Sequence, residues 1–185
     1  MNKIDIRKKA RQILVRFSHK EIASYSSVIS QSVFSLIQKS YSTQSLIIGG
    51  YMPLFQEVKW FLAFENSHYH LSIPHIYDEE KMDYFEVFFS DIKLGKHGLR
   101  LQDECREIRV NPEVLLIPGL AFTKEGKRLG RGKGYFDRYL KNFKGLKIGI
   151  CFEKQLFQDI PTDQYDQKVD LVITEKNIYK NNKGK

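Results

Sequence analysis

Residues 113–122 read "EVLLIPGLAF" and form the most hydrophobic stretch of the chain. A short apolar run that closes on a proline and a glycine is typical of a buried strand followed by a loop. We therefore expect a central strand here, ending at Pro118-Gly119. The segments on either side of it decide which kind of sheet surrounds this strand.

These flanking segments alternate between strand-like runs and helical spacing of apolar residues. Helices are predicted over 6–17, over 18–37 with a cap formed by Ser18 and Glu21, and over 57–67 and 134–143. Further strands are predicted at 45–52, 69–74, 83–89, 146–152 and 169–175. Because helices alternate with strands, the sequence predicts an α/β fold, a three-layer domain whose mostly parallel central sheet is flanked by helices.

Length and composition indicate one compact domain. The chain has 185 residues, of which 42% are apolar, and this suffices for a core. We expect a single domain over 1–180 followed by a basic tail over 181–185, and we expect the polar stretch that begins at Asn177 to be frayed. The sequence has no signal-like segment and no apolar run of about 18 residues. The prediction is a cytoplasmic monomer with no membrane partner.

Net charge narrows the class of ligand. The formal charge is +8 and the pI is about 9.3. Such a balance attracts nucleic acid, anionic membranes, or small phosphorylated and polycarboxylate ligands, without choosing among them. Cys105 and Cys151 do not form a CxxC pair, so neither zinc nor a redox motif is indicated.

A glycine-rich basic loop follows the central strand, within "GKRLGRGKGYFDRYL" (126–140). Ligands of open α/β sheets bind beyond the carboxyl ends of strands, so a site is expected here. Glycines allow backbone N–H groups to converge on an anion, and the start of a helix adds further donors. The key positions are Gly130, Arg131, Gly132, Lys133 and Gly134. The spacing fits neither a Walker A loop nor a Rossmann fingerprint. It predicts a polyphosphate site of another kind, with a solvated basic turn as the alternative.

Asp137 follows Gly134 by about one helical turn. A carboxylate repels bound phosphates unless a cation intervenes, and Mg²⁺ typically binds one or two protein carboxylates together with phosphate oxygens. Asp137 is therefore a candidate magnesium ligand. The alternative is an ion pair with Arg138 or Lys141 on a solvated helix face.

The stretch "PGLAFTKEGKRLGRGKGYFDRYL" (118–140) resembles the signature of the 5-formyltetrahydrofolate cyclo-ligase family, also called 5,10-methenyltetrahydrofolate synthetase. The family's pattern has an acid in place of Thr123 and a second tyrosine in place of Phe136. Further segments resemble the family in the same order: Lys3 and Arg7, "YMPLFQE" (51–57) and "IPTDQYDQKVDLVITE" (160–175). The resemblance covers nearly the whole chain and is strongest in its second half.

This resemblance implies an enzyme that closes a ring at the expense of ATP. ATP would phosphorylate the formyl oxygen of 5-formyltetrahydrofolate, and N10 would then displace phosphate to give 5,10-methenyltetrahydrofolate. The implied catalytic residues are Arg131 and Lys133. The implied ATP-binding residues are Lys3, Arg7, Arg128, Leu129, Gly130, Arg131, Gly132, Lys133, Gly134, Tyr135 and Phe136.

The same resemblance implies a folate site and a metal site. Met52, Glu57 and Tyr135 would contact a reduced folate, whose glutamyl tail, single or extended, suits a basic protein. Asp137 and Asp166 would hold Mg²⁺. As an alternative, Asp166 would only shape the turn before the last strand, as Asp163 or Asp170 could.

Three departures from the family's pattern concern the folate side. They are Trp60, His75 after Pro74, and the segment "HGLRLQDE" (97–104), which contains Arg100–Gln102. Two alternative functions therefore stay open. One is an ATP-dependent enzyme of the same fold that acts on a related N-acyl or thiamine-linked substrate. The other is a small basic nucleic-acid-binding protein, although no RNA-binding aromatic signature accompanies the loop.

Overall fold

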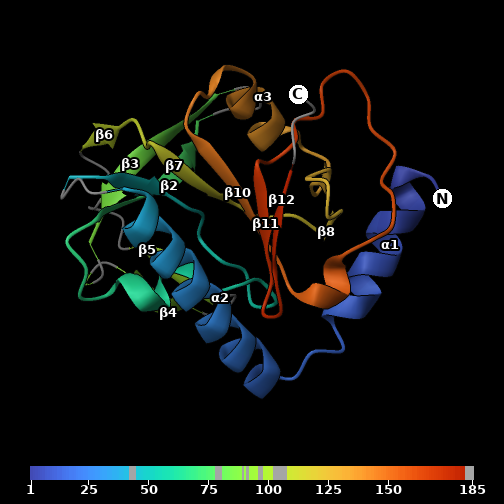
Figure 1. Ribbon diagram of the computed structural model, residues 1–185, viewed down its shortest axis with the longest axis horizontal. Helices are drawn as coiled ribbons and strands as arrows, with labels where there is room; N and C mark the ends of the chain where they lie inside the picture. Colours follow the sequence, from blue (N-terminus) through green and yellow to red (C-terminus); the bar gives the residue numbers. More distant parts are fainter. Residues whose placement is uncertain are drawn as a thin grey trace.

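The computed structural model describes residues 1–41, 45–77, 81–88, 90, 92–95, 98–101 and 108–181. An eight-stranded sheet lies at its centre, between helices (Figure 1). The strands, in the order in which they lie side by side, are β12 (Ile178–Lys180), β11 (Leu171–Ile173), β10 (Leu146–Ile150), β7 (Val114–Ile117), β1 (Ile47–Gly49), β2 (His70–Ile76), β3 (Met82–Val87) and β6 (Arg109–Val110). Two hairpins lie outside it: β4 (Ile92–Gly95) with β5 (Gly98–Leu101), and β8 (Ala121–Phe122) with β9 (Arg128–Leu129).

The five central strands are parallel, and the outer strands run antiparallel to their neighbours. β7 pairs in parallel with both β1 and β10, and these pair in parallel with β2 and β11. β12, β3 and β6 are antiparallel. The predicted α/β class with a mostly parallel centre is therefore confirmed.

The central strand is buried on both faces, as a strand covered by helices on either side must be. Val114 and Leu116 belong to one core cluster, together with the apolar faces of the first two helices. Leu115 and Ile117 belong to a second cluster, which includes Leu140 of the third helix. Alternate side chains of β7 thus pack into two separate helical layers, and the three-layer arrangement follows.

The helices are α1 (Lys3–Leu14), α2 (His19–Ser40) and α3 (Tyr135–Asn142), with short 3₁₀ helices η1 (Trp60–Phe64) and η3 (Glu153–Gln155). The predicted cap of α2 is confirmed: the Ser18 hydroxyl accepts from the Glu21 amide, and the Glu21 carboxylate accepts from the Ser18 amide. The Asn2 side chain caps α1 by accepting from the Ile4 and Asp5 amides. Both caps satisfy amides that an isolated helix start leaves unbonded.

Two local predictions differ from the structure. The helix predicted over 57–67 is only the 3₁₀ helix η1, because serines of α2 bond its backbone: Ser26 accepts from the Lys59 amide, and Ser30 accepts from the Ala63 amide and donates to the Trp60 carbonyl. The polar stretch that begins at Asn177 was predicted to be frayed, but it contains the strand β12, which pairs with β11.

The backbone amide of Asn181, at the start of the predicted frayed tail, donates to the Asp170 carbonyl, and residues 182–185 lie outside the described residues.

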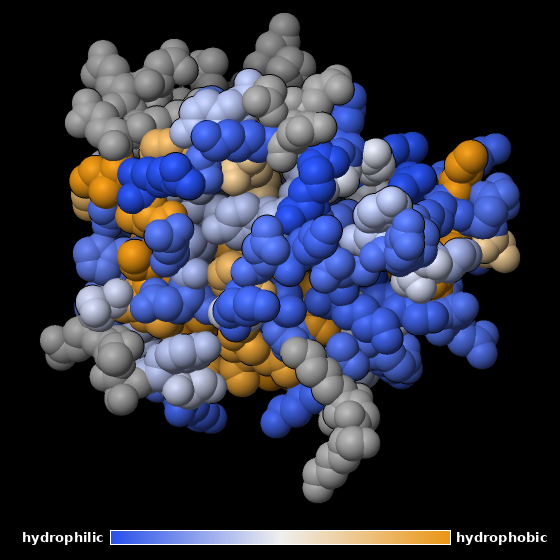
Figure 2. Space-filling view, turned by 90° about the horizontal axis from the view of Figure 1, so that it is seen from above, coloured by the Kyte–Doolittle hydropathy of each residue, from blue (hydrophilic) through white to orange (hydrophobic). Residues whose placement is uncertain are grey.

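The face seen in Figure 2 is mostly hydrophilic, with smaller hydrophobic areas between the charged groups. Within the described ranges, no helix is both long and apolar enough to cross a bilayer.

Candidate functional site

The glycine-rich loop lies between the carboxyl end of β7 and the start of α3. The chain leaves β7, forms the β8–β9 hairpin and reaches α3 through residues 130–134. Gly132 and Gly134 have φ angles of 108° and 73°, a region that favours glycine. Gly134 is the N-cap of α3 and supplies no side-chain cap. The first amides of α3 thus have no capping side chain and are suited to an anion.

Two cavities flank this loop. The large cavity, of about 850 Å³, is lined by Lys3, Arg7, Leu129, Gly130, Gly132, Lys133, Gly134, Asp137, Arg138, Lys141, Asp163, Gln164, Tyr165, Asp166 and Gln167. The small cavity, of about 220 Å³, is lined by Glu57, Pro118, Gly119, Arg128, Gly130, Arg131, Lys133, Gly134, Tyr135, Phe136 and Asp137. Four residues line both: Gly130, Lys133, Gly134 and Asp137. The loop and the first turn of α3 are therefore a wall shared by the two cavities.

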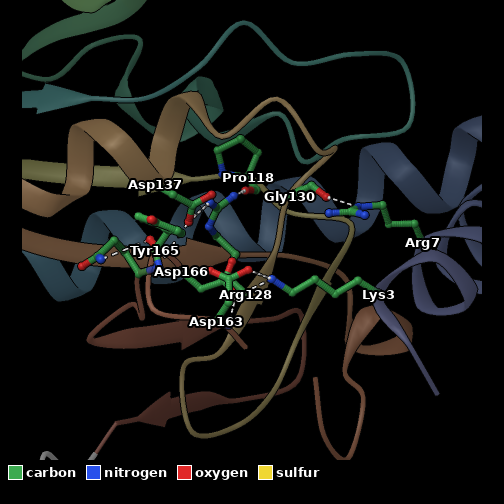
Figure 3. Close-up of polar contacts among 10 residues, drawn as sticks. Lys3, Arg7, Pro118, Arg128, Gly130, Asp137, Asp163, Tyr165 and Asp166 are labelled. Carbon is green, nitrogen blue, oxygen red and sulfur yellow. Dashed lines mark hydrogen bonds and ion pairs between the residues drawn. The ribbon is translucent and has the colours of Figure 1, made fainter. Parts of the chain in front are cut away.

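The start of α1 lies beside the loop, and its Lys3 and Arg7 side chains point toward the large cavity (Figure 3). Arg7 Nε donates to the Gly130 carbonyl at 3.1 Å. Lys3 Nζ lies 2.7 Å from Asp163 Oδ2 and 2.5 Å from Asp166 Oδ2. The hydrogen bond from Lys3 lowers the pKa of Asp163. Burial lowers the pKa of Lys3, but its two carboxylate partners outweigh burial and the pKa is raised. A basic helix start is thus fixed at the cavity by the loop and by two acids.

Arg128 lines the small cavity and is held by Asp137, the Pro118 carbonyl and the Phe136 ring; we call these four residues the frame of the site. Its side chain is 3% exposed, and its NH2 group donates to Asp137 Oδ1 at 2.7 Å. Its NH1 group donates to the Pro118 carbonyl at 3.2 Å, and the guanidinium lies over the Phe136 ring at 5.7 Å. Arg128 Nε is buried and has no hydrogen-bond partner among the described residues. Arg128 therefore forms an ion pair with Asp137, a partner that the sequence analysis did not consider.

The two acids predicted to hold magnesium line the large cavity together. Asp137 is paired with Arg128, and Asp166 is paired with Lys3. Among the described residues, no group of three or more histidines, cysteines, aspartates or glutamates could hold a metal ion. Two carboxylates at one cavity fit Mg²⁺ that takes its other ligands from phosphate oxygens and water. They do not form a complete metal cage.

The small cavity joins Glu57 to the loop. Glu57 Oε1 accepts from Arg131 NH2 at 2.7 Å and from Arg131 Nε at 3.1 Å. Glu57 Oε2 accepts from the Leu54 amide at 2.9 Å. Tyr135 lines the same cavity, and the Arg138 guanidinium lies over its ring at 5.2 Å. A predicted folate contact and a predicted catalytic cation are thus direct partners.

Some predicted residues are not brought to either cavity. Met52 is half-buried and packs against the first core cluster. Trp60 is buried, and its Nε1 donates to the Tyr51 carbonyl at 2.7 Å. His75 lies on β2 and contacts Tyr77, just after that strand, and Phe85 on β3. None of the three lines the two cavities. Of the third departure, the side chain of Arg100 and all of Gln102 lie outside the described residues.

Two residues that line the large cavity, Asp163 and Gln167, were not among the predicted site residues. Asp163, an alternative in the sequence, shares Lys3 with Asp166, and the Asp163 amide donates to the Asp166 carboxylate at 2.7 Å. The Gln167 amide donates to Asp137 Oδ1 at 3.3 Å. The spacing of the two acids in "DQYD" was the available signal for Asp163. A backbone contact such as that of Gln167 has no signal in the sequence.

A family model matches residues 1–175 of this chain, and its description is the 5-formyltetrahydrofolate cyclo-ligase family. A Saccharomyces cerevisiae protein named "5-formyltetrahydrofolate cyclo-ligase" is 28% identical over 202 residues, covering 91% of this chain and 92% of that protein. A Schizosaccharomyces pombe protein named "Probable 5-formyltetrahydrofolate cyclo-ligase" is 30% identical over 128 residues, covering 59% of this chain. The chain spans 63% of the length of the S. pombe relative, just under two thirds.

A solved structure shows the same architecture. The NMR structure of Aquifex aeolicus 5,10-methenyltetrahydrofolate synthetase is 31% identical, has a TM-score of 0.78, and is matched over 100% of this chain and 95% of that one. The Mycoplasma pneumoniae 5,10-methenyltetrahydrofolate synthetase, at 24% identity and a TM-score of 0.73, agrees in fold. The arrangement of strands and helices is therefore shared over essentially the full chain.

Proposed function

This chain belongs to the 5-formyltetrahydrofolate cyclo-ligase family, and we propose that it converts 5-formyltetrahydrofolate to 5,10-methenyltetrahydrofolate with consumption of ATP. The observation that carries the proposal is the shared wall. Lys133 lines both the large and the small cavity. Two substrates that occupy one cavity each would meet at this residue. An enzyme that transfers a phosphoryl group from one ligand to another needs such a meeting point.

The proposed reaction has two steps. The formyl oxygen on N5 attacks the γ-phosphorus of ATP, the bond to the β-phosphate oxygen breaks, and ADP leaves. N10 then attacks the formyl carbon, the carbon–oxygen bond breaks with release of phosphate, and N10 loses its proton. Phosphorylation is needed because an amide oxygen is a poor leaving group.

In this proposal the large cavity holds the nucleotide. Phosphoryl transfer asks the protein mainly for positioning and for neutralisation of charge. Lys3 and Arg7 supply positive charge from α1, Lys133 supplies it from the loop, and the first amides of α3 supply donors. Arg128, which is fixed by Asp137 and the Pro118 carbonyl, holds the wall in place.

The small cavity holds the pterin end of the folate. Glu57 would accept hydrogen bonds from ring N–H groups, and Tyr135 would pack beside the ring. Asp137 and Asp166 would hold Mg²⁺, which neutralises phosphate charge. Met52, which lines neither cavity, would act through the packing of the 51–57 segment. The monomeric state, the cytoplasmic location and the one-domain boundary stay predictions.

The test mixes purified protein with Mg·ATP and 5-formyltetrahydrofolate and follows the absorbance of the methenyl product. We expect product only when ATP is present, together with one ADP for each methenyl group. ATP consumption without the methenyl chromophore would favour a related N-acyl or thiamine-linked substrate. Affinity for nucleic acid that falls steeply with salt and ignores nucleotide would favour the nucleic-acid-binding alternative.

A further inference from the structure

The carboxylate of Glu57 is already engaged before any pterin is considered. Oε1 accepts two hydrogen bonds from the Arg131 guanidinium, and Oε2 accepts one from the Leu54 amide. A pterin that uses this carboxylate must share or displace one of these donors. The backbone donor belongs to the turn that carries Glu57, whereas the guanidinium comes from a residue 74 positions away. Arg131 is therefore the donor that can leave.

The two partners differ in their freedom. The side chain of Glu57 is 12% exposed, and that of Arg131 is 45% exposed. Arg131 stands between Gly130 and Gly132, whose lack of side chains leaves room for its backbone to turn. Both glycines line the large cavity. A long cation on this segment can thus face Glu57 on one side of the wall or a polyphosphate on the other.

We propose that Arg131 couples the two substrates. In the observed pairing it occupies the carboxylate that the folate needs. A nucleoside triphosphate in the large cavity offers a stronger anionic partner, draws Arg131 across the wall, and releases Glu57 to the pterin. This rests on the proposed function, because it assigns one substrate to each cavity.

The size of the effect follows from the pair. A partly exposed ion pair contributes up to about 1 kcal/mol, which corresponds to about a fivefold change in affinity. Nucleotide should therefore tighten folate binding by about threefold to fivefold. Since such coupling is reciprocal, folate should tighten nucleotide binding by the same factor.

The experiment measures the dissociation constant of 5-formyltetrahydrofolate by calorimetry, with and without Mg²⁺ and a non-hydrolysable ATP analogue. Three variants are compared with the wild-type protein. Arg131→Met removes the cation, Glu57→Gln removes its charge partner, and Arg16→Met makes the same chemical change in the exposed turn after α1, away from both cavities. The Arg16→Met protein should behave as the wild type.

Arg131→Met should bind folate about threefold to fivefold more tightly than the wild type without nucleotide, and the analogue should tighten it no further. Glu57→Gln should bind folate more weakly and should also show no response to the analogue. Weaker folate binding by Arg131→Met, or undiminished tightening by the analogue, would overturn the proposal. A wild-type protein that turns over both substrates but shows no coupling overturns this inference alone. One that binds no folate in either condition overturns the proposed function as well.

Discussion

The frame around Arg128 and the cavity-side cations Lys3 and Arg131 differ in how deeply their ion pairs are buried. In the frame, Arg128 and Asp137 form an ion pair with side chains 3% and 19% exposed. On the cavity side, Lys3 pairs with Asp163, whose side chain is 57% exposed, and Arg131 pairs with Glu57 while remaining 45% exposed itself. Breaking a buried pair is costly, whereas exposed pairs exchange partners at little cost.

The difference teaches which charges can take part in binding. Arg128 is held by Asp137, by the Pro118 carbonyl and by the Phe136 ring, so it keeps its place whatever enters the cavities. Lys3 and Arg131 have carboxylate partners that a phosphate can replace. We therefore expect substitutions on the cavity side to change catalysis and substitutions in the frame to change stability.

The largest expected effect is on the cavity side. Lys133→Ala should lower turnover about a thousandfold, because a cation beside the transferred phosphoryl group stabilises charge that develops in the transition state. The thermal midpoint should stay within about 2 °C, since Lys133 is exposed. The methenyl absorbance assay measures the rate, and Lys144→Ala, a change of an exposed lysine outside both cavities, is the control. A rate above a tenth of the wild type would remove Lys133 from the mechanism.

The frame comes second and should respond in stability. Arg128→Met should lower the free energy of unfolding by about 3 kcal/mol, because Asp137 is left without its buried partner. Its matched control is Lys127→Met, which removes the pair with the exposed Asp159 from the neighbouring position and should cost much less stability. Urea denaturation measures both. Equal losses in the two variants would erase the distinction between frame and surface.

Asp137 belongs to both parts and should show an intermediate effect. Asp137→Asn should raise the Mg²⁺ concentration for half-maximal activity about tenfold, since one carboxylate of two is lost and the amide oxygen can still accept from Arg128. Asp163→Asn, a change of an acid that is paired with Lys3 rather than with the frame, should leave this concentration nearly unchanged. A titration of activity against Mg²⁺ measures the difference. An unaltered requirement in Asp137→Asn would contradict the ligand assignment.

The smallest expected effect is electrostatic. The hydrogen bond from Lys3 lowers the pKa of Asp163, so this pair stabilises the protein above the ordinary aspartate pKa and loses its effect as pH falls through the lowered value. Lys3→Met should move the pKa of Asp163 upward, toward the ordinary value of 3.8. Asp159, whose pKa is lowered by Lys127, should not respond and is the internal control. Carbon-detected NMR titration reads both groups, and a shift confined to Asp159 would contradict the pairing.

Local patterns in the sequence predicted what local forces determine. The cap of α2 depends on Ser18 and Glu21, three residues apart, and the central strand depends on one apolar run; both were predicted correctly. The 57–67 segment was mispredicted because the buried serines of α2, about thirty residues earlier, bond its backbone.

The residues that form the site could not be predicted from local sequence patterns alone. The residues of the loop alone predicted a polyphosphate site, and the family resemblance added Lys3, Glu57 and Asp166 to the predicted site. Nothing in the sequence states that Arg131 pairs with Glu57, because these residues are 74 positions apart and the pair forms only when both ends of the chain segment are folded. The same holds for Lys3 and Asp166, which are 163 positions apart.

The positive φ angles of Gly132 and Gly134 also limit how this protein can be redesigned. A side chain at either position would strain the backbone, so substitutions at those two sites cost stability. Arg131, which precedes the two glycines, and Lys133, which lies between them, carry no such constraint and are exposed. A combinatorial library that randomises only these two codons would therefore sample new anion preferences without first having to rescue folding.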